Sequence, residues 1–143
     1  MEKIINNELK QLNLWLNVNR LALNISKTNF VIFHTNKRPL NHIVTLKINR
    51  KAIMQKDHIK YLGIIIDNHL DWKHHILNVS KKLSRSIGVM YKLRDCMNKK
   101  MLVNIYYSLI YSNIVYGIQV WGSACVTELN KILVLQKKND DQK

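Results

Sequence analysis

The order of apolar and polar positions predicts a helix at the start of the chain. Between residues 3 and 18, apolar side chains recur every three or four positions, which is the spacing of one face of an α-helix. They are Ile4, Ile5, Leu9, Leu12, Trp15 and Leu16. Lysine and asparagine residues lie between them. We therefore expect an amphipathic helix over residues 3–18.

β-Branched and aromatic residues predict a small antiparallel sheet in the next segment. The run NFVIFH at 29–34 is typical of a short strand, and Arg38-Pro39 marks its end. From residue 43 onward, the pattern predicts a hairpin that turns near Asn49-Arg50. A third strand, over Ile59–Ile66, is expected to pair beside this hairpin.

Helical spacing replaces the strand pattern near residue 71, without a linker rich in Gly, Pro or Ser. The apolar positions of the new pattern are Ile76, Val79, Leu83, Ile87 and Met90. Helical content continues over about 98–121, and a last helix is expected over 127–138. The sequence thus predicts an α+β fold with two lobes, a sheet with its N-terminal helix over 1–71 and a helical lobe over 72–143.

The charge balance indicates a polyanionic partner. The chain has 23 Lys and Arg against 9 Asp and Glu, a formal net charge of +14, whereas solubility of a small domain needs a net charge of only about 2 to 8. Opposite the apolar stripe of the 72–100 segment lie Lys81, Arg85 and Lys92, which we call the basic ridge. The only acid in that segment is Asp95, so the ridge predicts a phosphate-facing surface.

Sites for small ligands find little support in the sequence. Each of the four glycines is isolated, so no phosphate-binding loop is formed, and no serine lies in a Gly-flanked elbow. The candidate metal ligands are His69, His74, His75 and Cys96. Adjacent histidines on a helix diverge by about 100°, which argues against a shared ion. The adjacent pair Asp140-Asp141 lies in a polar C-terminal tail.

Cysteine usage and the absence of a signal-peptide pattern predict an intracellular location, with nucleus and cytoplasm both open. Cys96 and Cys125 are expected to be small apolar fillers. Residues 101–121 carry no charge and are long enough to span a bilayer. Asn, Ser, Gln and four Tyr residues within this stretch favour packed helices over a membrane span.

The motifs of the chain, taken in order, resemble a known family. LNLWLNVNRLALNISKTNFVIF is followed by KYLGIIID, LDWKHHI, GVMYKLR, IYYSLIYSNIVYGIQVWG and LNKILVLQKK. This collinear set covers roughly residues 9–138 and resembles the reverse transcriptase, an RNA-directed DNA polymerase, of non-LTR retrotransposons of the jockey and LINE kind. The resemblance implies a late part of the polymerase palm over 1–71, followed by the helical thumb.

The resemblance also implies roles for individual residues. Lys27 matches the lysine proposed to protonate the departing pyrophosphate as a general acid. Tyr61, Leu62 and Gly63 match the primer-grip turn. The basic ridge would contact phosphates of the RNA/DNA template-primer duplex, and Trp72, Tyr116 and Trp121 are expected in the thumb core.

The family's catalytic aspartate pair precedes the helix that opens this sequence. The resemblance therefore implies a polymerase fragment that needs no cofactor of its own and is inactive alone, whereas the complete parent enzyme uses Mg²⁺. The missing fingers and first palm strands would be partners if the chain is part of a larger polyprotein. A truncated or decayed element and one exon of a longer reading frame remain open. The alternatives are a stand-alone basic nucleic-acid-binding module and a small membrane protein.

Overall fold

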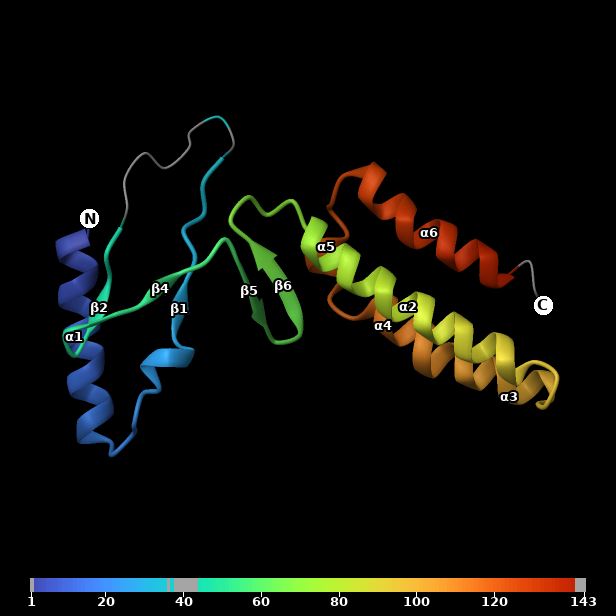
Figure 1. Cartoon of the computed structure of the whole chain (residues 1–143), viewed down its shortest axis with the longest axis horizontal. Coiled ribbons are helices and arrows are strands. Elements are labelled where there is room, and N and C mark those ends of the chain that lie inside the picture. Colours follow the sequence, from blue (N-terminus) through green and yellow to red (C-terminus); the bar gives the residue numbers. More distant parts are fainter. Residues whose placement is uncertain (1, 36, 38–43, 141–143) are drawn as a thin grey trace. The chain divides into compact units, whose positions relative to one another are not determined.

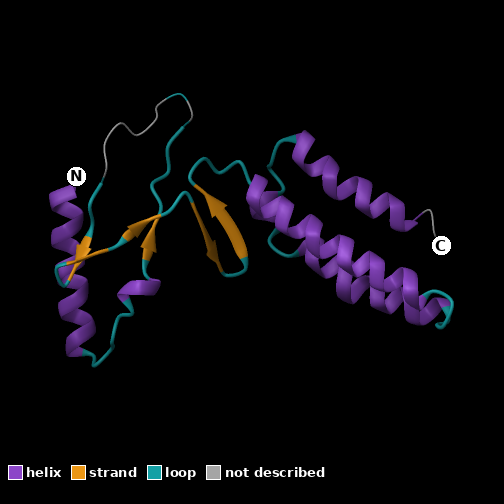
Figure 2. Cartoon of the chain, viewed as in Figure 1, coloured by secondary structure: helices purple, strands orange, loops and turns teal. Residues whose placement is uncertain are grey.

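The fold is α+β, as the sequence predicts. The structure is a computed structural model that describes residues 2–35, 37 and 44–140. Strands occur only in the first half of the described chain, and helices dominate the second half (Figures 1 and 2). The chain divides into two compact units, one comprising residues up to 60 together with 67–70, the other 61–66 and the residues from 71 onward. Each unit is described by itself below.

The strands form three separate pairs instead of the single antiparallel sheet that we expected. β1 (Asn29–Phe30) pairs with β4 (Met54–Gln55) in parallel. β2 (Lys47–Ile48) and β3 (Lys51–Ala52) pair in the antiparallel sense, and β5 (His58–Tyr61) pairs with β6 (Ile64–Asp67). Of the strand predicted over 29–34, only the first two residues enter a sheet. The predicted strand end at Arg38-Pro39 lies outside the described residues.

The predicted turn at Asn49-Arg50 is confirmed. Both residues have positive φ, 50° for Asn49 and 64° for Arg50. Two consecutive positive φ values give a turn whose twist matches that of paired strands, and asparagine adopts this conformation more readily than most residues. The turn joins β2 directly to β3.

The strand predicted over Ile59–Ile66 is wrong, because the chain reverses within it. Leu62 and Gly63 have φ of 45° and 85°, which makes them a second two-residue turn between β5 and β6. Strands joined by two residues can pair only in the antiparallel sense. These two strands pair with each other, and in the described part of the chain neither pairs with the 47–52 hairpin.

The first unit is held together by α1 (Glu2–Val18) and a small apolar cluster. Leu46, Ile48 and Ile53 are buried, with Ile5 and Leu9 of α1 packed against them. Polar side chains of α1 bind the backbone beside β2. The Asn6 amide donates to Thr45 O and accepts from Lys47 N, at 3.1 and 2.8 Å, and Glu2 Oε1 accepts from Thr45 N at 3.1 Å. The predicted N-terminal helix therefore forms, and one face of it is fixed to a strand edge.

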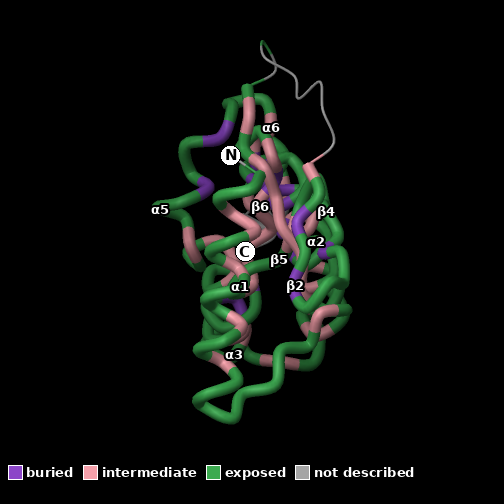
Figure 3. The backbone as a smooth tube through the Cα atoms, turned by 90° about the vertical axis from the view of Figure 1, so that its left-hand side faces the viewer, coloured by how far each residue is buried: buried purple, intermediate pink, exposed green. Residues whose placement is uncertain are grey.

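The second unit is a helical assembly around α2 (Lys73–Leu93). Its other helices are α3 (Lys99–Ile105), the π-helix η2 (Tyr106–Tyr111), α4 (Ser112–Val115), α5 (Ile118–Trp121) and α6 (Val126–Asp140). The predicted stripe of α2 packs against η2 and α6. Trp72 and Trp121 are buried in this core, as predicted, whereas Tyr116 is 55% exposed. Short buried segments alternate with exposed ones along the chain (Figure 3).

The charge-free segment 101–121 is broken into short helices. A π-helical turn interrupts it at Tyr106–Tyr111, and Gly117, with φ of 65°, separates α4 from α5. Ser108 and Asn113 bond back to carbonyls of the same segment, at Ile105 and Leu109. In the described residues, no helix is long and apolar enough to cross a membrane.

Candidate nucleic-acid interface

The basic ridge lies on α2, on the side opposite its buried face. His75, Ile76, Val79 and Leu83 are the buried residues of this helix. Lys81, Arg85 and Lys92 are all exposed. At about 1.5 Å of rise per residue, they span roughly 16 Å along the helix axis. At Gly88, between Arg85 and Lys92, an added Cβ would meet nothing within 4 Å.

No acidic residue occurs within α2. In the described part of the chain, ion pairs involve Lys73, Arg94 and Lys131, and none of the three ridge residues. An unneutralised row of cations on a rigid helix attracts polyanions, because no neighbouring carboxylate lowers its potential. The ridge therefore carries exposed cations without an acidic partner among the described residues, and its contact with phosphates stays a prediction.

The turn Leu62–Gly63 is the second candidate element. Tyr61 and Leu62 are 61% and 72% exposed, so the hairpin presents an aromatic and an aliphatic side chain to solvent. Gly63 has φ of 85°, a conformation that L-residues rarely adopt. Tyr116 Oη donates a hydrogen bond to Leu62 O at 2.5 Å, which ties the turn to the end of α4.

A buried histidine holds the next residues of the hairpin. His75 Nδ1 accepts a hydrogen bond from the backbone N–H of Ile65 at 3.2 Å. Its ring packs against Trp121, with centroids 5.6 Å apart. Burial, with a smaller contribution from the positive charge of Lys82, lowers the pKa of His75. The imidazole is therefore a neutral acceptor at neutral pH.

Lys27 lies in the other unit, at the end of the 3₁₀-helix η1 (Ile25–Lys27). Asn24 caps this turn by accepting from Lys27 N at 3.2 Å. After η1, the hydroxyl of Thr28 donates to Asn24 O at 2.9 Å. The Lys27 side chain is exposed. The turn residues and the ridge thus share one compact unit, and Lys27 belongs to a different one.

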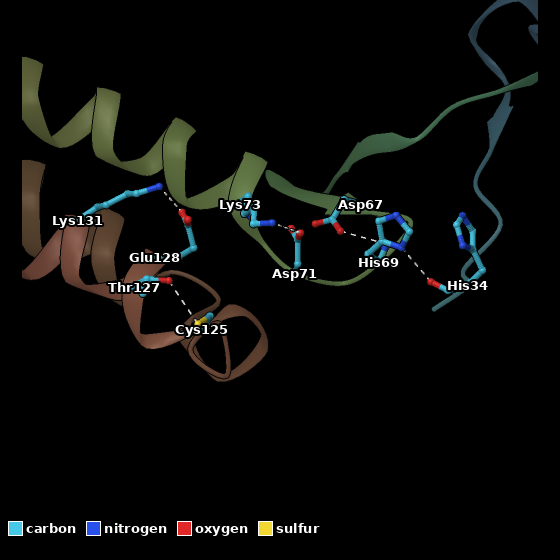
Figure 4. Close-up of polar contacts among 9 residues, drawn as sticks. All are labelled: His34, Asp67, His69, Asp71, Lys73, Cys125, Thr127, Glu128 and Lys131. Carbon is cyan, nitrogen blue, oxygen red and sulfur yellow. Dashed lines mark hydrogen bonds and ion pairs between the residues drawn. The ribbon is translucent and has the colours of Figure 1, made fainter. Parts of the chain in front are cut away.

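Asp67 and Asp71 accept hydrogen bonds from residues near them in the chain (Figure 4). Asp67 is buried, and its Oδ1 accepts from His69 N at 3.1 Å. Asp71 accepts from Lys73 N at 3.1 Å and pairs with Lys73 Nζ at 3.0 Å. In the residues that the structure describes, no three His, Cys, Asp or Glu side chains come together as a metal site. The pair Asp140-Asp141 lies outside the residues with described side chains.

The histidines considered as metal ligands point to different neighbours. His75 is buried and binds the hairpin, whereas His74 is exposed. His69 donates from Nδ1 to His34 O at 3.0 Å, and the two rings meet edge to face with centroids 4.6 Å apart (Figure 4). A carbonyl can only accept, so His69 carries its proton on Nδ1. These contacts are structural.

Both cysteines are exposed free thiols, so the prediction that they fill the core is wrong. Cys125 directly precedes α6, where backbone N–H groups lack helical partners. Thr127 Oγ1 donates to Cys125 Sγ at 3.3 Å, and hydrogen bonds from Thr127 lower the pKa of this thiol (Figure 4). Cys125 is therefore a local cap at the start of α6.

Sequence reasoning missed the parts of the site that hold the turn. The sequence pattern indicates His75 only as a candidate metal ligand and Tyr116 only as a core aromatic. A usable signal was present in Tyr116-Gly117, because a glycine often ends a helix and so marks a break in the chain at this tyrosine. The partner of that tyrosine lies 54 residues away, which local patterns do not reveal.

Comparison with known proteins gives a consistent set of relatives. The chain is 28% identical over 127 residues to the probable RNA-directed DNA polymerase from transposon X-element of Drosophila melanogaster, covering 87% of this chain and 14% of that protein. It is 36% identical over 96 residues to the RNA-directed DNA polymerase from mobile element jockey of the same species, covering 65% and 10%. The jockey polymerase of Drosophila funebris is 37% identical over 94 residues, covering 64% and 10%.

Neither a protein-family model nor a solved structure matches the chain. The chain spans only 10 to 14% of the length of these three relatives. Their names agree with the family that the ordered motifs resemble. The chain is thus a relative of one segment of the RNA-directed DNA polymerases of jockey-type non-LTR mobile elements.

Proposed function

We propose that the helical unit binds the phosphate backbone of a template-primer duplex as part of a reverse transcriptase. The observation that carries this proposal is the basic ridge, three exposed cations along one side of a 21-residue helix without an acid. The opposite side of the helix is buried. The ridge is thus held on a helix whose backbone is already formed, and only its exposed side chains have to be ordered when a ligand binds.

The length of the ridge suits a duplex. Phosphates of one strand are spaced by about 3.4 Å along the axis of DNA, so roughly 16 Å corresponds to about five phosphates. Lysine and arginine contacts with phosphates position a protein on a duplex without reading bases. The binding is therefore independent of sequence, as templated copying requires.

In the complete enzyme, we assign Lys27 the role of a general acid toward pyrophosphate and the Tyr61-Leu62-Gly63 turn a place near the primer end. An exposed ammonium on a short capped helix suits the first role, because it is accessible to a charged product. An exposed turn with glycine suits the second, because it permits close approach of the backbone.

Magnesium, which the resemblance implies for the complete enzyme, does not fit the described acids. Two-metal catalysis needs carboxylates that hold both ions a few ångströms apart. Asp67 and Asp71 accept hydrogen bonds within their own turns, and the described residues assemble no group of three metal ligands. We therefore propose that this chain by itself binds nucleic acid without polymerising it.

The test removes the ridge charges and measures binding of a mixed RNA–DNA duplex over a salt series. Replacing Lys81, Arg85 and Lys92 with Gln should reduce the slope of log affinity against log salt by roughly 2 to 3, because each lost phosphate contact removes about 0.9. Affinity should fall equally for duplexes of unrelated sequence. Circular dichroism should show an unchanged helix content, since these side chains are exposed.

A matched control changes three other cations. Lys73, Arg94 and Lys131 are also exposed, but each pairs with an acid, at 3.0, 3.7 and 2.5 Å. Their replacement with Gln alters the net charge by the same amount and should change the salt slope by less than about 1. Equal effects of the two triple variants would show that net charge, and not the ridge, determines binding.

A further inference from the structure

Four consecutive hairpin residues are contacted by the helical segments of the same unit. Leu62 O accepts from Tyr116 Oη, and the Ile65 N–H donates to His75 Nδ1. A Cβ on Gly63 would lie 3.3 Å from the Tyr116 ring, and a Cβ on Gly117 would lie 2.6 Å from Ile64 Cδ1. The contacting residues of the helical segments are His75, Tyr116 and Gly117. Two of these residues, Tyr116 and Gly117, belong to the sequence motif VYGIQVW, and His75 belongs to α2.

A hydrogen bond from a buried tryptophan fixes the backbone of Tyr116. Its carbonyl accepts from Trp121 Nε1 at 2.9 Å, and Trp121 is 1% exposed. The helix ends at Tyr116, where ψ of 112° turns the chain, and Gly117 continues with positive φ. Tyr116 is therefore held by hydrogen bonds at its backbone carbonyl and at its hydroxyl, although about half of its surface is exposed.

The hairpin tip that Tyr116 holds is apolar. Tyr61 and Leu62 have large exposed surfaces and no charge with which to bind phosphate. An aromatic ring and an aliphatic side chain can cover the outer face of a terminal base pair, where stacking is available and phosphates are absent. The ridge, to which the proposed function assigns the phosphate contacts, belongs to the same unit. The chemistry of the tip therefore suits the open end of a duplex.

We propose that Tyr116 is a positioning residue that holds the Leu62–Gly63 turn in the orientation needed to recognise an open duplex end. The inference rests on the proposed duplex binding and adds a residue that does not itself touch the nucleic acid. Loss of the Tyr116 hydroxyl frees the Leu62 carbonyl and lets the turn move, while the ring still fills the space beside Gly63. Recognition of the end then weakens, and phosphate binding by the ridge continues.

The experiment compares two forms of one short RNA–DNA hybrid, using the full chain. In the first form one end is open and the other is closed by a loop; in the second form loops close both ends. The wild-type chain should bind the first form more tightly. Tyr116→Phe should reduce this preference by roughly two- to tenfold, the effect of one ordinary hydrogen bond. Its salt slope should equal that of the wild type.

The control is Tyr111→Phe, the same chemical change at a tyrosine whose ring packs edge-on against Tyr107. It should keep the full preference. Leu62→Ala provides a second test variant, because this side chain is 72% exposed and its truncation opens no cavity. It should lose the preference as Tyr116→Phe does, with an unchanged circular dichroism spectrum.

The outcomes separate the two proposals. A wild-type chain that binds neither hybrid in a salt-dependent manner would overturn the proposed function and this inference together. Salt-dependent binding without preference for the open end would overturn the inference and leave the proposed function standing. Retention of the preference by Tyr116→Phe, or equal loss of it in Tyr111→Phe, would show that Tyr116 has no positioning role.

Discussion

His75 Nδ1 accepts a hydrogen bond from the backbone N–H of Ile65, 3.2 Å away, and this contact fixes the protonation of the ring. A nitrogen that accepts cannot carry a proton, so the neutral form holds its hydrogen on Nε2. Among the described residues, that buried nitrogen has no hydrogen-bond partner. A second proton on the ring would therefore break the contact with Ile65 and leave a buried charge.

This arrangement predicts a loss of stability in mild acid. Burial, followed by the charge of Lys82, lowers the pKa of His75 in the folded chain. The unfolded chain then binds more protons than the folded chain, so stability rises with pH. The contribution of His75 is complete above its unfolded pKa of about 6.5 and is lost as pH falls toward the folded pKa. The free energy of unfolding, measured with urea at a series of pH values from neutral to mildly acidic, should show this loss.

Two variants assign the effect to this ring. His75→Gln should be less stable than the wild type at neutral pH and should lack the part of the pH dependence that His75 contributes. His74→Gln replaces the exposed neighbour, and this variant should retain the full pH dependence of the wild type. Parallel stability curves for wild type and His75→Gln would contradict this account.

Glycine-to-alanine exchange should have opposite effects at two positions. Gly63→Ala introduces a Cβ 3.3 Å from Tyr116 Cε1 at φ of 85°, and we expect destabilisation by about 1 to 2 kcal/mol. Gly88→Ala lies within α2 with nothing within 4 Å of the new Cβ, and it should stabilise by about 0.5 to 1 kcal/mol. Chemical denaturation of both variants tests the pair, and a stabilising Gly63→Ala would refute the strained turn.

Gly117 and Ile64 should show energetic coupling. A Cβ on Gly117 would lie only 2.6 Å from Ile64 Cδ1, so Gly117→Ala should destabilise by about 1 to 3 kcal/mol. Ile64→Val removes that Cδ1 and alone should cost about 0.5 to 1.5 kcal/mol. The double variant should be more stable than the sum of the two losses predicts. Additive losses of stability in the double-mutant cycle would mean that the two side chains are not in contact.

Primer extension should give no product with this chain alone. The described carboxylates do not assemble a group of three metal ligands, and two-metal transfer needs such a site. The assay uses a poly(A)-oligo(dT) template with deoxynucleoside triphosphates and Mg²⁺. Template-dependent incorporation above a no-enzyme control would contradict the expectation and would require ligands among Asp57, Asp67 and Asp71.

Elements defined by local periodicity were predictable from the sequence. The helix over 3–18 and the long helix after residue 71 follow from apolar spacing, and both form. The turn at Asn49-Arg50 follows from the preference of asparagine for positive φ. The ordered motifs resemble the same RNA-directed DNA polymerases that comparison with known proteins finds as relatives.

Features that depend on distant residues were not predictable in the same way. The run Tyr61 to Ile66 is apolar throughout, so alternation cannot reveal a reversal within it, and leucine is an unusual residue for positive φ. The hydroxyl of Tyr116 finds its acceptor 54 residues away. The parallel pairing of β1 with β4 likewise joins residues far apart in the sequence. The ridge was predictable, because helix geometry alone places its cations.

The side-chain amide of Asn6 makes the hydrogen bonds to the segment beside β2 that a neighbouring strand would otherwise make. With its donor on Thr45 O and its acceptor on Lys47 N, one side chain replaces one peptide group of a ladder. The match is geometrical, since four residues of helix and two residues of strand both advance by about 6 to 7 Å. Glu2, one turn earlier, continues the series at Thr45 N. At these backbone groups α1 occupies the sheet edge, so a strand of a second copy could pair with them only after α1 has detached.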